Sequence, residues 1–209
     1  MNKHLSIIKH YEECLRMYGD THKGVDWPNA KDLAKRYKVM LDLVHKTEED
    51  KTLLDFGCGA SHFYQYIIEQ DVQTLNYVGL DASQAFVDLS KSKYPDNQYI
   101  CLDVLAEPEK LQYYDYVVMN GVFTEKRQLT FDDMYEYLRK ILTIVFSKTR
   151  RGISFNLMSK QVDWERDDLF HMPIGELTNF LAKSLSRHYT IRNDYGLYEY
   201  TVYVYKEPS

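Results

Sequence analysis

The segment Leu53–Phe63, with the sequence LLDFGCGASHF, constrains the fold of this chain more than any other stretch. An apolar run ends at Asp55, Gly57 and Gly59 follow at once, and an amphipathic segment then begins. This order predicts a buried strand, a tight glycine turn and a helix. Glycine adopts backbone conformations that other residues avoid and has no Cβ, so such a turn lets the backbone approach a ligand at the helix N-terminus. The segment therefore predicts an α/β fold with a nucleotide-like ligand at the turn, with a purely structural turn as the alternative.

The glycine spacing disfavours a dinucleotide-binding site. A G-x-G-x-x-G fingerprint would place its third glycine at position 62. That position is His62, and Ser61 precedes it. A pyrophosphate would meet side chains where it needs bare backbone, so a nicotinamide-dependent oxidoreductase is a disfavoured alternative.

A second predicted strand, Asn76–Asp81, ends in a carboxylate about 22 residues after Gly59. In doubly wound sheets an acidic residue at this place accepts hydrogen bonds from ribose hydroxyls. One carboxylate can accept from two neighbouring hydroxyls, which makes Asp81 a candidate for ribose binding. The alternative is that Asp81 caps the helix that starts near Ser83.

The next two predicted strands also end in polar side chains. Tyr99–Asp103 ends in a carboxylate, and Tyr114–Gly121 ends in Asn120 and Gly121. The carboxyl ends of parallel strands meet at one edge of an open sheet, where ligands bind. These side chains are therefore expected to converge with the glycine turn.

The C-terminal part of the chain predicts the end of the sheet. Gly152–Met158 reads as a fifth strand, and a helix is expected around Gly175–Leu185. Tyr189–Tyr195 and Tyr198–Lys206 alternate polar and apolar residues and are separated by little more than Gly196 and Leu197. This pattern predicts an antiparallel hairpin of a sixth and a seventh strand.

Taken together, Lys51–Lys206 resembles the core of the class I S-adenosylmethionine (SAM)-dependent methyltransferases. The glycine turn is similar to the first motif of that family, D-x-G-C-G-x-G, with Ser61 in place of the last glycine. The terminal hairpin is also typical of the family, and nicotinamide-binding Rossmann domains lack it. The resemblance implies an enzyme of the small-molecule bacterial type, with SAM as cofactor. It also implies a seven-stranded, mostly parallel, doubly wound sheet with a C-terminal antiparallel hairpin.

The resemblance implies roles for individual residues. Asp103 would contact the adenine amino group, and Val104 would form part of the wall around the ring. The loop at Asn120 and Gly121 would border the methionine end and the acceptor. The predicted cofactor-binding residues are Arg36, Asp55, Gly57, Gly59, Asp81, Ala82, Asp103, Val104, Asn120 and Gly121.

Residues 1–50 are predicted to form a helical cap on the core of residues 51–209. Apolar residues at helical spacing predict one helix near Ile7–Tyr18 and a second over Pro28–Lys46. The loop between them and the second helix look like the cap of bacterial small-molecule methyltransferases, including some in polysaccharide modification. Arg36 could bind the methionine carboxylate through its guanidinium, or be an ordinary surface arginine. Trp27 and Tyr37, with Glu125 after the fourth strand, are predicted to contact the substrate, although Trp27 could instead pack between helices.

The chemistry of methyl transfer depends on the acceptor. An amine acceptor needs only to be neutral, whereas a hydroxyl needs a general base. His62, Asn156 and His171 are weak catalytic candidates, and each could instead have a structural role; Glu125 is a further candidate base. O-methylation of a small polar molecule, such as a sugar, is slightly favoured. A SAM- or nucleoside-binding module without turnover is the main alternative.

Composition narrows the partners. The chain has 209 residues, a formal net charge of −5 and no long basic run, so no nucleic-acid partner is expected. No run approaches the roughly 18 apolar residues of a membrane span, and no secretory signal is recognisable, which favours the cytoplasm. Cys14, Cys58 and Cys101 are far apart in the sequence and predict neither a disulfide framework nor a metal site. A monomer or a homodimer is expected.

Overall fold

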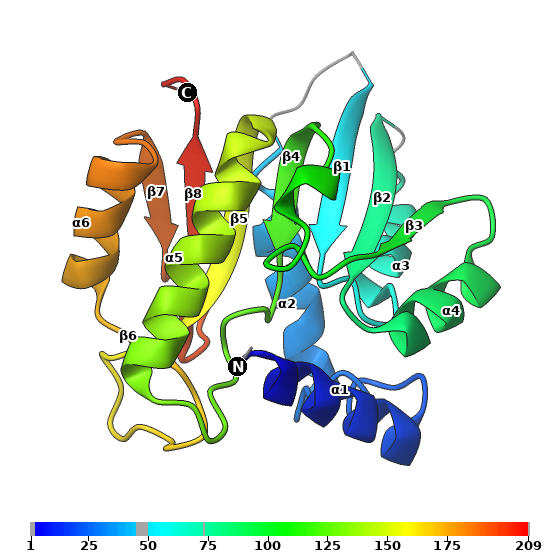
Figure 1. Ribbon diagram of the computed structural model, residues 1–209, viewed down its shortest axis with the longest axis horizontal. Helices are drawn as coiled ribbons and strands as arrows, with labels where there is room; N and C mark the ends of the chain where they lie inside the picture. The colour runs from blue at the N-terminus through cyan, green and yellow to red at the C-terminus, as the bar shows by residue number, and fades with distance from the viewer. Residues whose placement is uncertain (1–2, 45–49, 73, 209) are drawn as a thin grey trace.

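A mixed eight-stranded sheet forms the centre of the computed structural model, which describes residues 3–44, 50–72 and 74–208. Helices cover both faces of the sheet (Figure 1). The main path of the sheet has the order β3-β2-β1-β4-β5-β8-β7. The strands are β1 Lys51–Phe56, β2 Leu75–Asp81, β3 Gln98–Cys101, β4 Tyr114–Met119, β5 Thr149–Ser159, β6 His171–Met172, β7 Tyr189–Arg192 and β8 Glu199–Tyr205. This is the predicted α/β architecture.

The strand register confirms the parallel sheet and its antiparallel end. β1 pairs in parallel with β2 and β4, and β4 pairs in parallel with β5. β8 lies antiparallel between β5 and β7, as the hairpin predicts. Two details differ from the prediction. The hairpin connection runs from residue 193 to 198, because β7 already ends at Arg192, and an eighth strand, β6, pairs with the end of β5. With two residues, β6 is too short to produce a sequence pattern.

The helices follow from local sequence signals. They are α1 Leu5–Tyr18, α2 Ala30–Leu41, α3 His62–Glu69, α4 Gln84–Lys93, the short 3₁₀ helix η1 Pro108–Lys110, α5 Phe131–Ser147 and α6 Ile174–Ser184. Thr130 and Asp133 form a reciprocal capping box at the start of α5. Asn29 caps α2, which therefore begins two residues later than predicted. The predicted end of that helix, at Lys46, lies outside the described residues.

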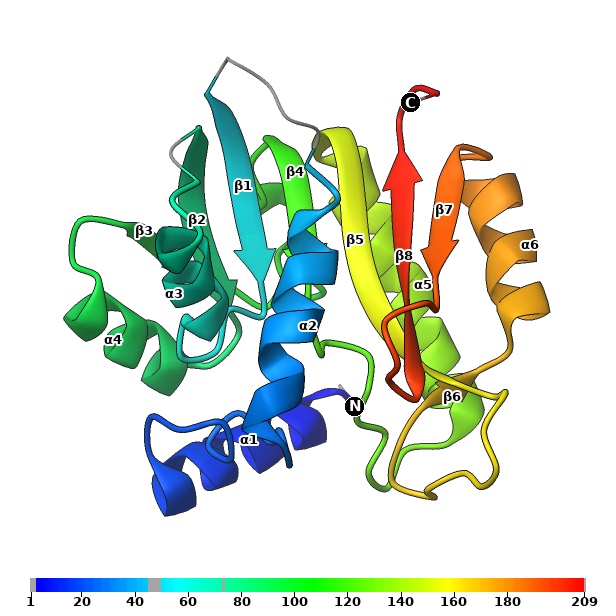
Figure 2. The ribbon, with the colours of Figure 1, turned by 180° about the vertical axis from the view of Figure 1, so that it is seen from behind.

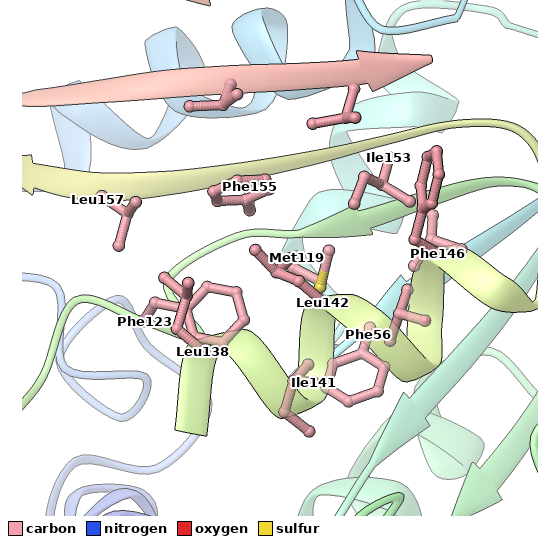
Figure 3. Packing of buried hydrophobic residues seen from close by; sticks show 14 of the residues in the cluster. Phe56, Met119, Phe123, Leu138, Ile141, Leu142, Phe146, Ile153, Phe155 and Leu157 are labelled. Carbon is pink, nitrogen blue, oxygen red and sulfur yellow. The ribbon is translucent and has the colours of Figure 1, made fainter. Parts of the chain in front are cut away.

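One hydrophobic layer lies between the sheet and α5. In Figure 3 Leu142 of α5 lies beside Met119 of β4, and Ile141 of α5 lies beside Phe56 of β1; Phe155 of β5 belongs to the same cluster. These five side chains are almost fully buried. Burial of each such side chain contributes about 1.5–3 kcal/mol, so this face fixes α5 on the sheet.

The opposite face of the sheet is covered by α2, α3 and α4 (Figure 2). α2 packs closely enough for the Tyr203 hydroxyl to donate to the carbonyl of Val39, and the Tyr205 hydroxyl donates to Leu43 at 3.5 Å. The second helix of the predicted cap is thus packed on the sheet. The boundary at residue 50 stays a prediction. None of the helices in the described part of the chain is long and apolar enough to cross a membrane.

α1 lies apart from both helical layers. It runs across the end of the sheet toward which the parallel strands point (Figures 1 and 2). This is the edge where the glycine turn and the polar strand ends meet, so α1 and this edge together enclose the candidate site.

Candidate functional site

A pocket lies between the carboxyl edge of the sheet and α1. The structure brings together there every predicted cofactor-binding residue except Arg36. These are Asp55, Gly57, Gly59, Asp81, Ala82, Asp103, Val104, Asn120 and Gly121. The pocket wall also contains four residues that the sequence did not assign to a site: His4, which directly precedes α1, and Ile7, Ile8 and Tyr11 of α1. The sequence showed that apolar residues of this helix recur at helical spacing, but it did not show that this face lines a pocket.

The glycine turn after β1 has a positive φ at each glycine, +75° at Gly57 and +52° at Gly59. The carbonyl of Leu80 accepts hydrogen bonds from the N–H groups of Gly57 and Cys58, which ties the turn to β2. A Cβ on Gly57 would lie 2.9 Å from Val122 Cγ2, so the Val122 side chain would have to shift. The turn therefore requires glycine for both its backbone and its packing.

Ser61 takes the place of the third glycine of the family motif and also has a positive φ, +56°. Its hydroxyl lies 2.8 Å from Ser90 Oγ and 3.1 Å from the Tyr99 hydroxyl, in a fully buried position. The side chain thus points away from the pocket into the protein. These contacts hold a backbone conformation that serine rarely adopts.

Asp81, at the end of β2, organises the turn. One carboxylate oxygen accepts from the N–H of Gly59 at 2.9 Å, and the other accepts from the N–H of Ser83 at 2.9 Å. Desolvation raises the pKa of Asp81 to about 6, even though these hydrogen bonds lower it. Asp81 therefore holds the start of α4 and also lines the pocket, so the two roles considered for it are compatible.

Asp55, at the end of β1, is buried and accepts a hydrogen bond from the Tyr77 hydroxyl at 2.8 Å. Burial raises the pKa of Asp55 to about 7, and the nearby charge of Asp81 adds to this, although the Tyr77 hydrogen bond lowers it. Two adjacent carboxylates with raised pKa values in one pocket are typical of a functional site.

Asp103 connects the pocket to the first helix. One carboxylate oxygen accepts from the N–H of Leu105, and the other lies 3.0 Å from His4 Nε2. The His4 ring stacks on Tyr137 at 5.6 Å between centroids. Val104 is buried beside Asp103. The start of α1 is thereby attached to the part of the pocket predicted to hold adenine.

The loop after β4 forms the other end of the pocket. The Gly121 N–H donates to Asn156 Oδ1 at 2.7 Å, and Asn156 Nδ2 donates to Glu199 at 3.1 Å. Asn156 is fully buried and lies outside the pocket lining. Asn120 Oδ1 is buried and has no hydrogen-bond partner among the residues that the structure describes. A Cβ on Gly121 would lie 2.8 Å from the Trp27 ring.

Arg36 lies next to this loop but not in the pocket lining. Its Nε contacts both carboxylate oxygens of Glu199, at 2.9 and 3.0 Å, and its guanidinium lies 4.0 Å from the centre of the Trp27 ring. Trp27 itself lines the pocket. The predicted role of Arg36 at the methionine carboxylate stays a prediction, and its partner in the structure is Glu199.

The remaining candidates occupy different places. His62 and Tyr37 line the pocket, and His62 Nε2 lies 2.7 Å from Asp20 of the cap loop. Burial lowers the pKa of His62, which favours the neutral ring that can accept a proton, although Asp20 opposes this effect. His171 lies outside the pocket lining in β6, where Nδ1 contacts the Ser159 carbonyl at 2.6 Å.

Glu125 is buried in the loop after β4, also outside the pocket lining. Burial, followed by the charges of Asp26 and Asp168, raises the pKa of Glu125 to about 7. Within the described ranges of the chain, Glu125 Oε2 has no hydrogen-bond partner, and it lies 3.5 Å from Arg127 Nη1. Glu125 is therefore a poorly neutralised carboxylate close to the cap.

Comparison with known proteins agrees with this geometry. Residues 54–144 match the family model described as a methyltransferase domain. The Mycobacterium tuberculosis (strain ATCC 25618 / H37Rv) protein named "Putative methyltransferase Rv1506c" is 26% identical over 157 residues, which cover 73% of this chain and 91% of that protein.

Two solved structures share the fold over nearly the whole chain. Magnesium protoporphyrin IX methyltransferase (ChlM) from Synechocystis PCC 6803, with bound SAH, matches with a TM-score of 0.66 and 13% identity, covering 97% of this chain and 100% of that one. A TehB-like SAM-dependent methyltransferase from Corynebacterium glutamicum matches with a TM-score of 0.60 and 12% identity, covering 95% and 100%.

Proposed function

Because the chain belongs to the class I SAM-dependent methyltransferases, we propose that it methylates a small polar molecule, with an oxygen acceptor such as a sugar hydroxyl favoured over nitrogen. The observation that carries this proposal is the convergence of the glycine turn, Asp81, Asp103 and Asn120 in one pocket walled by α1. A wall made by the cap favours an acceptor small enough to fit beneath it.

The residues of the pocket fit the cofactor. Asp81 would accept from the ribose hydroxyls and Asp103 from the adenine amino group, with Val104 against the ring. Asn120 Oδ1, which is buried and receives no hydrogen bond from the described part of the chain, would accept from the methionine ammonium group. The positive-φ glycines at 57 and 121 leave the backbone bare where a Cβ would collide with its surroundings. Arg36 does not line the pocket in the structure, so its guanidinium would have to move to reach the methionine carboxylate.

The protein contributes position, exclusion of water and a base. Bound SAM would supply an electrophilic methyl group whose leaving group is the neutral thioether of SAH. Trp27 and Tyr37, which line the pocket, would orient the acceptor. Of the catalytic candidates, His62 has the position for a base, since it lines the pocket and Asp20 orients its ring. Asn156 would act by holding Gly121, and the His171 site lies outside the pocket lining.

Binding and turnover measurements distinguish two other functions from the proposed one. A SAM-binding module without turnover would bind SAM and its demethylated product SAH but release no SAH. A nicotinamide oxidoreductase would bind NAD. Calorimetry with SAM, SAH and NAD distinguishes these cases, and binding of NAD in preference to SAM would refute the proposal.

Turnover is tested with SAM that carries an isotopically labelled methyl group. The protein is incubated with separate pools of sugars, sugar nucleotides, amines and carboxylic acids, and mass spectrometry detects the label. We expect labelled product in a hydroxyl-containing pool and matching release of SAH. Label only in the amine pool would refute the oxygen acceptor, and SAM binding without SAH release from any pool would favour the binding module.

A further inference from the structure

Three side chains of metal-binding type converge where α1 meets the loop that connects it to α2. His10 Nε2 lies 2.6 Å from Asp26 Oδ2 and 3.7 Å from Cys14 Sγ. All three candidate ligand atoms lie within 4.8 Å of one another. Cys14 is buried, and the other two residues are half-buried. None of the three lines the cofactor pocket.

The backbone explains why they meet. His10 and Cys14 are four residues apart on α1, a spacing that places side chains on one face of a helix. Asp26 has a φ of +57°, a left-handed conformation that aspartate tolerates better than most residues. Its N–H donates to the Lys23 carbonyl at 3.0 Å, and this turn directs the carboxylate back toward α1.

A hydrogen-bonded His10–Asp26 pair does not account for the whole cluster. The same ring nitrogen faces both the carboxylate and the sulfur, and one N–H can donate well to only one of them. Tetrahedral Zn²⁺ with its usual bond lengths separates a nitrogen and a sulfur ligand by about 3.6 Å and a nitrogen and an oxygen ligand by about 3.4 Å. The nitrogen–sulfur distance already fits. The Asp26 oxygen lies 2.6 Å from His10 Nε2, so it would need to move about 0.8 Å farther from that nitrogen to fit the zinc geometry.

The surrounding charge also favours a cation. The buried Glu125 carboxylate has an oxygen with no hydrogen-bond partner among the described residues, and burial and then the nearby Asp26 charge disfavour its ionisation. Arg127 supplies a positive charge, but it is shared between Glu125 at 3.5 Å and Asp168 at 3.6 Å. A cation held between α1 and the loop would reduce the repulsion between Asp26 and Glu125.

We propose that His10, Cys14 and Asp26 bind one Zn²⁺ ion that fastens α1 to the cap loop. Nitrogen, thiolate and carboxylate donors suit zinc, and three protein ligands leave a fourth position for water or for Glu125. On binding, the Cys14 S–H bond breaks, a Zn–S bond forms, and the proton passes to solvent. The neighbour of His10, Tyr11, lines the cofactor pocket and donates to the Gly121 carbonyl at 3.4 Å, so the ion would steady that wall. The sequence predicts no metal site, because its cysteine spacing shows no motif.

The test is metal binding by the full chain. The purified protein is stripped with a chelator and titrated with ZnCl₂ in competition with a metal-binding dye, and CoCl₂ serves as a spectroscopic probe. We expect one Zn²⁺ per chain and a cobalt–thiolate absorption band. His10→Gln, Cys14→Ser and Asp26→Asn should each weaken Zn²⁺ binding at least about 10-fold. Cys101→Ser and His22→Gln, which change the same residue types outside the cluster, should bind like the wild type.

The result of this zinc-binding test does not depend on whether the protein transfers methyl groups. A cobalt–thiolate band in the wild-type protein that Cys14→Ser abolishes supports the site even if another variant folds poorly. Absence of stoichiometric Zn²⁺ binding by the wild-type protein, or equal binding by Cys14→Ser and Cys101→Ser, would overturn it. SAM binding is measured in parallel, and its absence would count against the proposed function and not against the zinc site.

Discussion

The Asp81 carboxylate accepts a hydrogen bond from the backbone N–H of Gly59 at 2.9 Å. This contact joins the end of β2 to the glycine turn after β1. The residue proposed to bind the ribose therefore also shapes the turn on which the rest of the cofactor would lie. Substitution of Asp81 should consequently affect both ligand binding and the unliganded fold.

Asp81→Ala should weaken SAM binding by about 1.5–3 kcal/mol, the range for charge-assisted hydrogen bonds. It should also lower the free energy of unfolding without ligand, because the N–H groups of Gly59 and Ser83 lose their acceptor. Calorimetry and urea unfolding measure the two effects. Asp88→Ala, at an exposed position of α4, is the control. Unaltered SAM affinity in Asp81→Ala would remove this residue from the site.

Gly59→Val should abolish SAM binding. A Cβ at this position would lie 3.2 Å from Val25 Cγ1 in the cap loop, on the pocket side of the turn. Gly196→Val is the matched control, since Gly196 also has a positive φ, +71°, but no atom within 4 Å of the added Cβ. The control should show only the backbone strain, about 1–2 kcal/mol of stability. Normal SAM binding by Gly59→Val would mean that the turn is purely structural.

The buried Asp55 should make stability depend on pH. The pKa of this carboxyl is raised to about 7 in the folded protein, so between pH 4 and 7 the folded state binds more protons than the unfolded state. The free energy of unfolding should therefore fall as the pH rises through this window and level off above it. Asp55→Asn removes the titration and keeps an oxygen near Tyr77, so it should make the fall smaller.

Urea unfolding of the unliganded protein at pH 5 and pH 8 measures this difference. The exposed Asp96→Asn controls for the loss of one negative charge. Asp81, with its pKa raised to about 6, should preserve part of the fall in Asp55→Asn. If wild type and Asp55→Asn lose the same stability between the two pH values, Asp55 does not titrate in this window.

Arg36→Ala should destabilise the protein by about 3–5 kcal/mol, the usual cost of leaving one member of a buried ion pair alone. Only 10% of the Arg36 side chain and 1% of the Glu199 side chain are exposed. Adding Glu199→Gln to Arg36→Ala should recover part of this loss. A double-mutant cycle by urea unfolding measures the coupling, and independent effects of the two substitutions would contradict a stabilising pair.

The same variants test Arg36 at the cofactor. If its guanidinium also binds the methionine carboxylate, Arg36→Ala should weaken SAM binding, whereas Glu199→Gln should leave it the same or stronger because the guanidinium is released. Calorimetry at a temperature where all variants are folded makes the comparison. Equal SAM affinity in wild type and Arg36→Ala would leave Arg36 with a structural role only.

Local sequence patterns were sufficient to predict the parallel sheet and the polar side chains that line the pocket at its edge. Asp55, Asp81, Asp103 and Asn120 each follow an apolar run and precede a turn. In a parallel sheet these places lie at one edge, so neither the helix packing nor the cap was needed to bring the four together. The positive φ at Gly57 and Gly59 likewise belongs to a turn that its own residues specify.

Only the tertiary structure decided the partners of the cap and the buried polar side chains. Arg36 and Glu199 are 163 positions apart, and His62 meets Asp20 across 42. Spacing along one helix or strand tells which residues share a face, but not what that face meets after packing. Asn156 was a catalytic candidate because it was expected near the ligand-binding edge after the fifth strand, yet its amide oxygen accepts from Gly121 and its amide nitrogen donates to Glu199. His10 and Cys14 were local neighbours in the sequence, and Asp26 joined them only because the chain turned back on itself.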